Sequence, residues 1–320
     1  MRILFITSTR LGDAVLSTGI LRYLLQQNPA SSVTVACGPA ARELFTAVPG
    51  LERIIVLDKM LLSLHWLYLW ANCVGCIWDV VVDLRNAPLT FIIPTKKAYR
   101  LFRSRAPGHH IKALAAILKI EKIVPSPYIW TTKENKNDAI RIVPDGTPVL
   151  AVGPTANWRA KQWRAERFIE LIHRLTRPDS ILPDARVLIL GREDERPTAL
   201  AIVESIPKHR CLDLIGRVDL LTAFACLQRS SLYIGNDSGL MHLAAASGIP
   251  TLGLFGPSPE DRYAPWGPRC SVVRGEAKFD EIFPENFNHR ETKTLMDGLS
   301  VTTVEKQVLE LWERVQKDLI

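Results

Sequence analysis

The sequence lacks most patterns that mark a metalloprotein, a disulfide-stabilised protein or a nicotinamide-dependent enzyme. Its six cysteines are scattered, and the one close pair, Cys73 and Cys76, has no second pair or histidine at ligand spacing. We therefore expect no metal site, and reduced thiols as in a cytosolic protein. The loop after the first predicted strand, R-L-G-D, has one glycine where the dinucleotide-binding fingerprint G-x-G-x-x-G needs three.

Long uninterrupted apolar runs are also missing. The run at residues 1–6 is too short for a signal peptide, and the run at 60–78 is broken by polar residues and a glycine. The second run predicts a buried or surface-docking helix rather than a membrane span. Its aromatic residues would suit a bilayer interface: Trp66, Tyr68 and Trp70.

Charge of one sign is in excess but not concentrated. The 320 residues contain 40 Lys and Arg against 33 Asp and Glu, a net charge of +7 with a pI near 9.1. This excess favours an anionic partner, either a phosphorylated substrate or a membrane surface. Because the cations form no long block, we expect no nucleic-acid binding.

What is present is an alternation of apolar strands and amphipathic helices, which predicts an α/β protein with parallel sheets. A polar stretch at 133–148 separates two halves of this kind and is typical of an interdomain connector. Strands are predicted at 2–7, 33–36, 54–57, 79–84, 99–102, 149–152, 186–190, 231–234 and 251–255. Helices are predicted at 14–27, 40–47, 60–76, 110–118, 166–175, 197–205, 221–227 and 301–319.

The most informative stretch is residues 235–256, G-N-D-S-G-L-M-H-L-A-A-A-S-G-I-P-T-L-G-L-F-G. It leaves a strand, crosses a polar turn and opens a short helix, with Asp237 or Ser238 as the N-cap and Gly239 allowing close backbone approach. Free amides at such a turn suit a diphosphate. An ordinary strand–turn–helix connection with a capping aspartate explains the same pattern.

Asp13 is the candidate for chemistry in the first half. It follows the first strand at the edge of the sheet where ligands bind in open α/β folds, and its carboxylate suits a general base. N-capping of the helix predicted to begin at residue 14 is the alternative.

The second half contributes the loop 153–163, G-P-T-A-N-W-R-A-K-Q-W. Lys161 suits a phosphate, and Asn157 offers a neutral donor. Trp163 is better explained by packing against the domain wall.

Two more side chains have two possible explanations. Glu195 follows the strand at 186–190 and suits ribose hydroxyls, but it also ends a solvated charge run. His242 lies one turn into the helix after the turn, where it faces either a ligand or the sheet.

Taken together, R-L-G-D-A-V-L-S-T at 10–18, K-Q-W at 161–163 and the long motif at 236–257 resemble the bacterial lipopolysaccharide heptosyltransferases of glycosyltransferase family nine. The resemblance runs from residue 1 to the C-terminal helix. It implies a GT-B fold with an acceptor-binding Rossmann-like domain at 1–140 and a nucleotide-sugar-binding domain at 141–300. It also implies a cleft between the domains and a final helix, 301–320, that packs toward the first domain.

The resemblance further implies roles for residues at matching positions. Asp13 is the expected general base. Binding of the nucleotide sugar is assigned to Asn157, Lys161, Glu195, Asp237, Ser238, Gly239 and His242. No cofactor or metal is expected, and the donor would be ADP-heptose.

Two departures from the family pattern suggest a divergent branch. Thr18-Gly19 stands where Thr-Pro is usual, and the segment 268–296 lacks the cysteine cluster of many members. The sugar is therefore the least determined part of the hypothesis.

We expect an inverting, metal-independent transfer of heptose to a phosphorylated, lipid-linked acceptor in the lipopolysaccharide core, on the cytoplasmic face of the inner membrane. A UDP-hexose or UDP-N-acetylhexosamine transferase of the same fold is the nearest alternative. An NAD-dependent oxidoreductase and a non-catalytic sugar-nucleotide binder are further alternatives.

Overall fold

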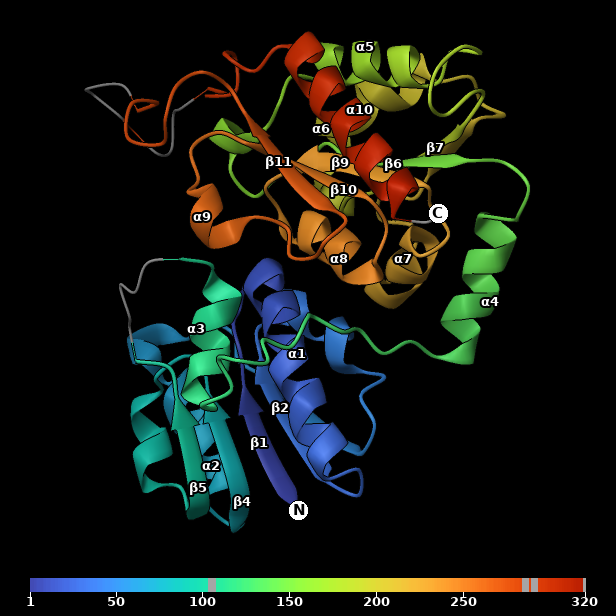
Figure 1. The fold of residues 1–320 in the computed structure, drawn as a ribbon. Helices are drawn as coiled ribbons and strands as arrows, with labels where there is room; N and C mark the ends of the chain where they lie inside the picture. The colour runs from blue at the N-terminus through green and yellow to red at the C-terminus, as the bar shows by residue number, and fades with distance from the viewer. Residues whose placement is uncertain (103–107, 284–287, 289–292, 319–320) are drawn as a thin grey trace. The chain divides into compact units, whose positions relative to one another are not determined.

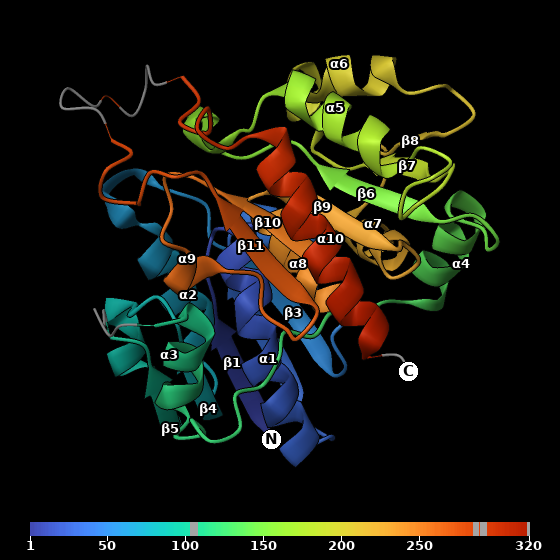
Figure 2. The same ribbon diagram turned by 45° about the horizontal axis from the view of Figure 1, so that its top comes forward.

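The computed structural model describes residues 1–102, 108–283, 288 and 293–318. Contacts between residues divide the chain into two compact units, Met1–Trp130 and Thr131–Ile320. Each unit is built on its own parallel β-sheet (Figures 1 and 2). The α/β fold predicted from the alternating pattern is therefore confirmed.

The first unit has a five-stranded sheet in the order β3-β2-β1-β4-β5. All neighbouring strands pair in parallel, so their carboxyl ends lie at one edge. The central strands are nearly continuous apolar runs because helices cover both faces of a parallel sheet. The strands are β1 (Arg2–Ile6), β2 (Ser32–Cys37), β3 (Leu51–Val56), β4 (Trp78–Asp83) and β5 (Thr95–Arg100).

Three helices pack in the first unit: α1 (Leu11–Gln27), α2 (His65–Cys73) and α3 (His110–Ile117). Leu69 and Cys73 of α2 cluster with Leu4 and Ile6 of β1, which point to the same face of the sheet. Helix α1 packs against α3. Among the described residues, no helix has both the length and the apolar character needed to cross a membrane.

Several predicted elements of the first unit differ from the structure. Helix α1 begins at Leu11 rather than at residue 14. The helix expected at 40–47 is two 3₁₀ turns, Pro39–Ala41 and Glu43–Phe45. The helix expected at 60–76 is a 3₁₀ turn, Leu61–Ser63, followed by α2.

The glycine at position 19 has a clear structural reason. A Cβ atom there would lie 2.5 Å from the carbonyl oxygen of Pro125. Next to it, the Thr18 hydroxyl accepts a hydrogen bond from the amide of Tyr128 (2.9 Å). The segment that ends the first unit therefore packs directly on α1 at this point, and any side chain would push it away.

The second unit has a six-stranded sheet in the order β11-β10-β9-β6-β7-β8. Three of its four inner strands, β6, β9 and β10, are buried at every residue, as expected for a parallel sheet covered on both faces. The strands are β6 (Val149–Gly153), β7 (Arg186–Ile189), β8 (Cys211–Asp213), β9 (Leu232–Asn236), β10 (Thr251–Phe255) and β11 (Cys270–Arg274).

The two edge strands, β8 and β11, were not predicted. Strand β8 has only three residues, and β11 is a short run in a region rich in proline and glycine. The four-residue helix α9 (Glu260–Tyr263) in that region was also missed. Because edge strands are only half covered, they lack the apolar run that marks a central strand.

The helices of the second unit include α10 (Val301–Lys317), whose apolar face belongs to the core of this unit. Val304, Val308 and Leu311 cluster with residues of the sheet and of α5, and α10 packs against α5, β10 and β11. That this helix also reaches the first domain stays a prediction. The other helices are α4 (Lys133–Ile142), α5 (Ala165–Leu175), α6 (Arg196–Ser205), α7 (Leu220–Leu227) and α8 (Gly239–Ser247).

The polar stretch at 133–148 begins with a helix, α4, that belongs to the second unit. Asn135 and Thr132 form a capping box at its start. The Asn135 amide also donates to the hydroxyl of Thr222 on α7 (3.0 Å). The polar composition of this stretch therefore reflects a helix that is docked on one side only. The contacts place the boundary between the units before this helix, at residues 130–131, whereas the sequence analysis placed it after residue 140.

Candidate active site

The turn between β9 and α8 is the centre of the candidate site in the second unit. Strand β9 ends at Asn236, and Ser238 is the N-cap of α8 with an extended backbone. The Ser238 side chain makes no capping hydrogen bond. The first-turn amides of α8 are thus not engaged by the cap side chain, and the positive end of the helix dipole can attract an anion.

Lys161 and Asp237 form an ion pair at this turn. The Nζ atom of Lys161 lies 2.6 Å from Oδ2 of Asp237, and the two side chains are 23% and 7% exposed. Lys161 is held on a 3₁₀ turn, Arg159–Lys161. Two residues that the sequence analysis assigned to the same ligand are therefore in contact, although 76 positions separate them.

Asn236 joins the loops around this ion pair and was missed by the sequence analysis. Its side chain is fully buried. Its Oδ1 accepts from the amide of Trp163 (3.1 Å), and its Nδ2 donates to the carbonyl of Pro154 (2.8 Å). An asparagine at the last position of a buried strand was the available signal, because a buried amide must find partners.

Trp163 packs in the wall of the second unit, as predicted. It is 2% exposed, its ring meets Phe168 edge-on at 5.0 Å, and its Nε1 donates to the carbonyl of Leu299 (2.9 Å). Asn157, on the same loop, is exposed.

Glu195 differs from its acidic neighbours. Its Oε2 accepts from the Thr155 hydroxyl (3.0 Å) and from the Arg192 amide (2.9 Å), and its side chain is 18% exposed, against 68% for Asp194. Thr155 lies just after β6, so Glu195 is fixed at the carboxyl edge of the sheet. The alternative explanation, a run of solvated charges, therefore fits Asp194 but not Glu195.

His242 lies within α8 and is 4% exposed. It therefore does not face bulk solvent. Its burial agrees with a position against either the sheet or a bound ligand.

The hydroxyl group of Tyr233 occupies the space that a side chain would need at Gly153 in β6 and at Gly235 in β9. A Cβ atom on Gly153 would lie 2.0 Å from the Tyr233 hydroxyl oxygen, and one on Gly235 would lie 2.3 Å from it. Burial raises the pKa of Tyr233 well above its usual value. The hydroxyl therefore stays protonated beneath the turn.

Asp13 lies in the first turn of α1 and is half-buried. Oδ2 of Asp13 accepts from the hydroxyl of Ser8 (3.4 Å). The N-cap of the helix is Arg10, so N-capping by Asp13, the alternative considered from the sequence, is wrong. Asp13 therefore lies at the carboxyl edge of the first sheet, in the helix that follows β1.

Asp83 is a second acid at that edge, and it has a structural explanation. It is fully buried at the end of β4, and it accepts from the amides of Arg85 and Ala87 and from the hydroxyl of Thr90. Burial raises the pKa of its carboxyl, against those hydrogen bonds. Its contacts fix the loop after β4.

All six cysteines are free, and burial raises the pKa of the Cys37 and Cys226 thiols to about 12. Within the described ranges, no group of three His, Cys, Asp or Glu side chains is placed to hold a metal ion.

Comparisons with known proteins identify the family of the chain. The family model described as glycosyltransferase family 9 (heptosyltransferase) matches residues 108–283. Lipooligosaccharide heptosyltransferase 2 of Haemophilus influenzae is 22% identical over 316 residues, which cover 86% of this chain and 88% of that protein.

Two solved structures share the fold over nearly the whole chain. The structure of E. coli ADP-heptose lipopolysaccharide heptosyltransferase II has a TM-score of 0.75 at 20% identity, covering 99% of this chain and 100% of that one. A family 9 glycosyltransferase from Veillonella parvula has a TM-score of 0.77 at 22% identity, covering 98% and 96%.

Proposed function

Because the chain belongs to glycosyltransferase family 9, we propose that it transfers heptose from ADP-heptose to the lipopolysaccharide core. Membership makes it a glycosyltransferase with the GT-B fold, which sets aside the oxidoreductase and the non-catalytic binder. The names of its relatives favour a heptose donor over the UDP-hexose alternative.

The ion pair of Lys161 and Asp237 beside the N-terminus of α8 supports this function most directly. We assign the donor diphosphate to the turn of Asp237, Ser238 and Gly239, through the amides of Ser238 and Gly239, and to the Lys161 ammonium. The Asp237 amide already donates to the carbonyl of Leu254 (3.1 Å). Negative charge grows on the diphosphate as the bond to the sugar breaks, and fixed donors stabilise that charge where it develops. This lysine and these amides would supply the stabilisation that other transferases take from a metal ion, so we propose a metal-independent reaction.

Three further side chains are assigned to the donor by their positions in the second unit. Glu195, held by the Thr155 hydroxyl and the Arg192 amide, would accept from ribose hydroxyls. Asn157 would donate to a phosphate oxygen, and His242 would stand beside the diphosphate.

Asp13 is the proposed general base. A carboxylate at this position removes the proton of the acceptor hydroxyl as that oxygen attacks the anomeric carbon from the face opposite the leaving diphosphate. The configuration at the anomeric carbon is then inverted.

The acceptor is proposed to be lipid-linked and reached at the cytoplasmic face of the membrane. The exposed apolar loop after β3 and the start of α2 support this: Leu61 and Leu62 of the loop are 83% and 86% exposed, and Leu64, Leu67 and Tyr68 follow at 47–53%. This loop leaves the carboxyl end of β3, the same edge of the sheet at which Asp13 follows β1. Apolar side chains entering the interface and a net charge of +7 both favour binding to an anionic bilayer.

The donor assignment is tested by comparing ADP with UDP in thermal-shift titrations, followed by turnover of ADP-heptose with a heptose-deficient core acceptor. We expect ADP to raise the Tm, UDP to leave it unchanged, and ADP to be released only when the acceptor is present. Stabilisation by UDP without any by ADP would overturn the proposal.

The membrane assignment is tested by sedimentation with anionic liposomes. Binding should fall at high salt and in the double variant Leu61→Ser, Leu62→Ser. The control is Ile140→Ser, since Ile140 is an exposed aliphatic residue of α4. Equal sedimentation of all three proteins would show that the loop does not contact the bilayer.

A further inference from the structure

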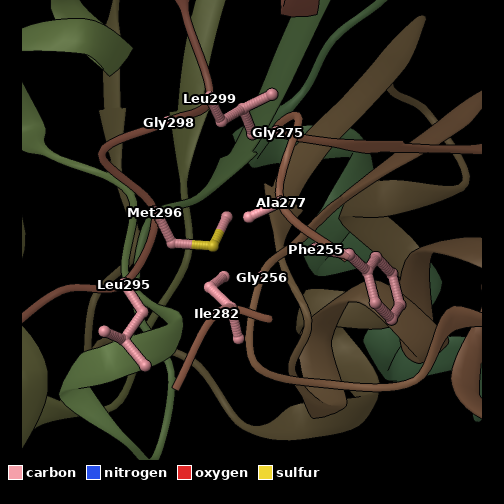
Figure 3. A pocket seen from close by; sticks show the side chains of 9 residues that line it. All are labelled: Phe255, Gly256, Gly275, Ala277, Ile282, Leu295, Met296, Gly298 and Leu299. Atoms are coloured by element: carbon pink, nitrogen blue, oxygen red, sulfur yellow. The ribbon is translucent and has the colours of Figure 1, made fainter. Parts of the chain in front are cut away.

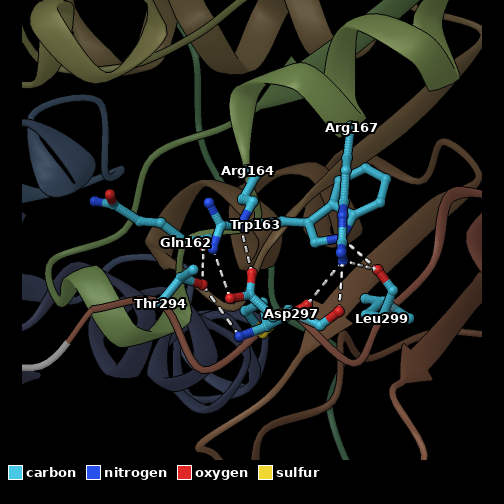
Figure 4. Close-up of polar contacts among 8 residues, drawn as sticks. Gln162, Trp163, Arg164, Arg167, Thr294, Asp297 and Leu299 are labelled. Atoms are coloured by element: carbon cyan, nitrogen blue, oxygen red, sulfur yellow. Dashed lines mark hydrogen bonds and ion pairs between the residues drawn. The ribbon is translucent and has the colours of Figure 1, made fainter.

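A segment late in the chain, residues 294–299, crosses the loop that carries the proposed phosphate-binding lysine. We call this segment the strap (Figure 4). The hydroxyl of Thr294 donates to the carbonyl of Gln162 (2.6 Å), and the amide of Leu295 donates to the carbonyl of Ala160 (3.0 Å). Both hydrogen bonds end on the backbone of the loop, so they fix its path and not only a side chain.

Ala160 and Gln162 are the two neighbours of Lys161 in the chain. The strap therefore holds the backbone on both sides of the lysine. On the far side of the loop, the amide of Trp163 is held by Asn236 (3.1 Å). A four-residue stretch is thus anchored at three of its positions, while the Lys161 side chain extends to Asp237.

The beginning of α5 adds a second set of contacts to the strap. Arg164 forms an ion pair with Asp297 through both carboxylate oxygens. Nη1 of Arg167 donates to the carbonyls of Asp297 (2.9 Å) and Leu299 (2.5 Å). Figure 4 shows these side chains converging on the strap from the loop and α5. Because most of the acceptors are backbone carbonyls, the contacts depend on one conformation of the strap.

The strap is also anchored in the core below it. Met296 and Leu299 are 2% and 1% exposed, and a Cβ atom on Gly256 would lie 2.2 Å from the sulfur of Met296. An apolar cavity of about 100 Å³ is lined by residues of the strap and by residues at the ends of β10 and β11 (Figure 3). It is lined by Phe255, Gly256, Gly275, Ala277, Ile282, Leu295, Met296, Gly298 and Leu299.

We propose that the strap positions Lys161 for the donor diphosphate, and that Thr294 is its main positioning residue. This rests on the proposed role of Lys161 in phosphate binding. A lysine on a free loop would lose side-chain and backbone entropy on contacting a phosphate, whereas a loop fixed in advance avoids most of that cost. Thr294 touches neither the donor nor the reacting atoms, and it acts only through the backbone next to Lys161.

The test replaces the Thr294 hydroxyl with a methyl group of similar size, Thr294→Val, and measures binding of ADP and of adenosine by titration calorimetry. Loss of one hydrogen bond that orients the lysine should weaken ADP binding by about five-fold. Adenosine, which has no phosphate, should bind as before, and Thr294→Ser should restore ADP binding. In turnover, KM for the donor should rise more than kcat falls.

The matched control is Thr176→Val. Thr176 is buried in the second unit, whereas Thr294 is half-buried. The Thr176 hydroxyl also donates to a backbone carbonyl, that of Ile172 (2.9 Å), at the end of α5. Thr176→Val therefore removes a hydroxyl-to-carbonyl hydrogen bond of the same kind at a place that does not contact the Lys161 loop. Thr294→Val should lose at least as much Tm as Thr176→Val, since it also removes the acceptor of the Met296 amide (3.1 Å). Only Thr294→Val should lose affinity for ADP.

A cycle with Lys161→Gln separates this inference from the function on which it rests. If the strap acts through Lys161, Thr294→Val should have no further effect on ADP binding once the ammonium is gone. If Lys161→Gln weakens ADP binding and Thr294→Val does not, the strap has no positioning role and the function stands. If neither substitution changes ADP binding, both the strap inference and the assignment of Lys161 are overturned.

Discussion

At the scale of single residues, the contact between Lys161 and Asp237 has a consequence for ligand binding. A carboxylate near a diphosphate is unfavourable by itself, but here it is paired with an ammonium at 2.6 Å. Before a ligand binds, the pair holds Lys161 beside the turn. With a diphosphate at the proposed site, the lysine would be shared between two anions, so the neutral amides of α8 would carry much of the attraction. Alanine at position 161 would leave the 7% exposed carboxylate of Asp237 without the hydrogen bond from Lys161. Glutamine is the better replacement because its amide still offers a hydrogen-bond donor.

Asp13 gives the sharpest prediction at this scale. Asp13→Asn keeps the shape of the side chain but removes the proton acceptor, so kcat should fall by about 10²–10⁴-fold. Binding of ADP should be unchanged, since the proposed donor site lies in the second unit.

The control for this prediction is Asp79→Asn, since Asp79 is a partly exposed acid of the first unit at the start of β4. It should retain turnover. Near wild-type turnover of Asp13→Asn would remove Asp13 from the role of base.

Gly153 gives a prediction about stability. Its substitution by alanine places a Cβ atom against the Tyr233 hydroxyl, so the free energy of unfolding should fall by about 1–3 kcal/mol. Gly75→Ala is the control because nothing lies within 4 Å of a Cβ atom there. Urea denaturation measures both, and equal stability of the two variants would mean that Tyr233 does not fill the space above Gly153.

At the scale of elements, each secondary structure contributes to the site in a different way. The central strands β6 and β9 carry the turn and the glycines at their carboxyl ends, where helix N-termini and loops gather. Helix α8 contributes its uncapped first turn. Helix α10 contributes no proposed ligand contact, but its apolar face completes the core beneath the strap.

The contribution of α10 is tested by two leucines on the same helix. Leu311 is 1% exposed and Leu309 is 39% exposed. Leu311→Ala should cost about 2–5 kcal/mol of unfolding free energy by removing buried methyl groups. Leu309→Ala should change it by less than about 0.5 kcal/mol. Urea denaturation measures the unfolding free energy of both variants. An equal loss in the two would contradict the packing of α10 on the core through Leu311.

At the scale of the whole molecule, the chain consists of two units that each have a sheet and a buried core of their own. The proposed base belongs to the first unit. Every residue assigned to the donor belongs to the second. On these proposed assignments, donor binding and proton removal would belong to different units, and turnover would require both.

A fragment containing only residues 131–320 tests this division. It contains the core residues that cluster with α10 and all the assigned donor residues, so we expect it to fold and to bind ADP within about ten-fold of the full chain. It should show no turnover with any acceptor. Circular dichroism and calorimetry would check folding and binding, and a folded fragment without affinity for ADP would place part of the donor site in the first unit.

The sequence by itself determined the class of fold and the position of the main turn. Buried parallel strands are continuous apolar runs, and the change from strand to polar turn to helix at 235–256 is a local pattern, so both can be found without tertiary contacts. The edge strands β8 and β11 and the short turns near residue 40 escaped prediction because their stability comes from neighbours and not from their own residues.

The tertiary structure alone decided how the candidate site is assembled. Lys161 meets Asp237 across 76 positions, Asn236 joins two loops, and the strap reaches Gln162 across 132 positions. Hydrogen bonds between distant segments leave no periodic pattern in a sequence, because any buried polar group can be satisfied by many partners. The fold brings these segments to one edge of a parallel sheet, and that placement turned separate candidate residues into one site.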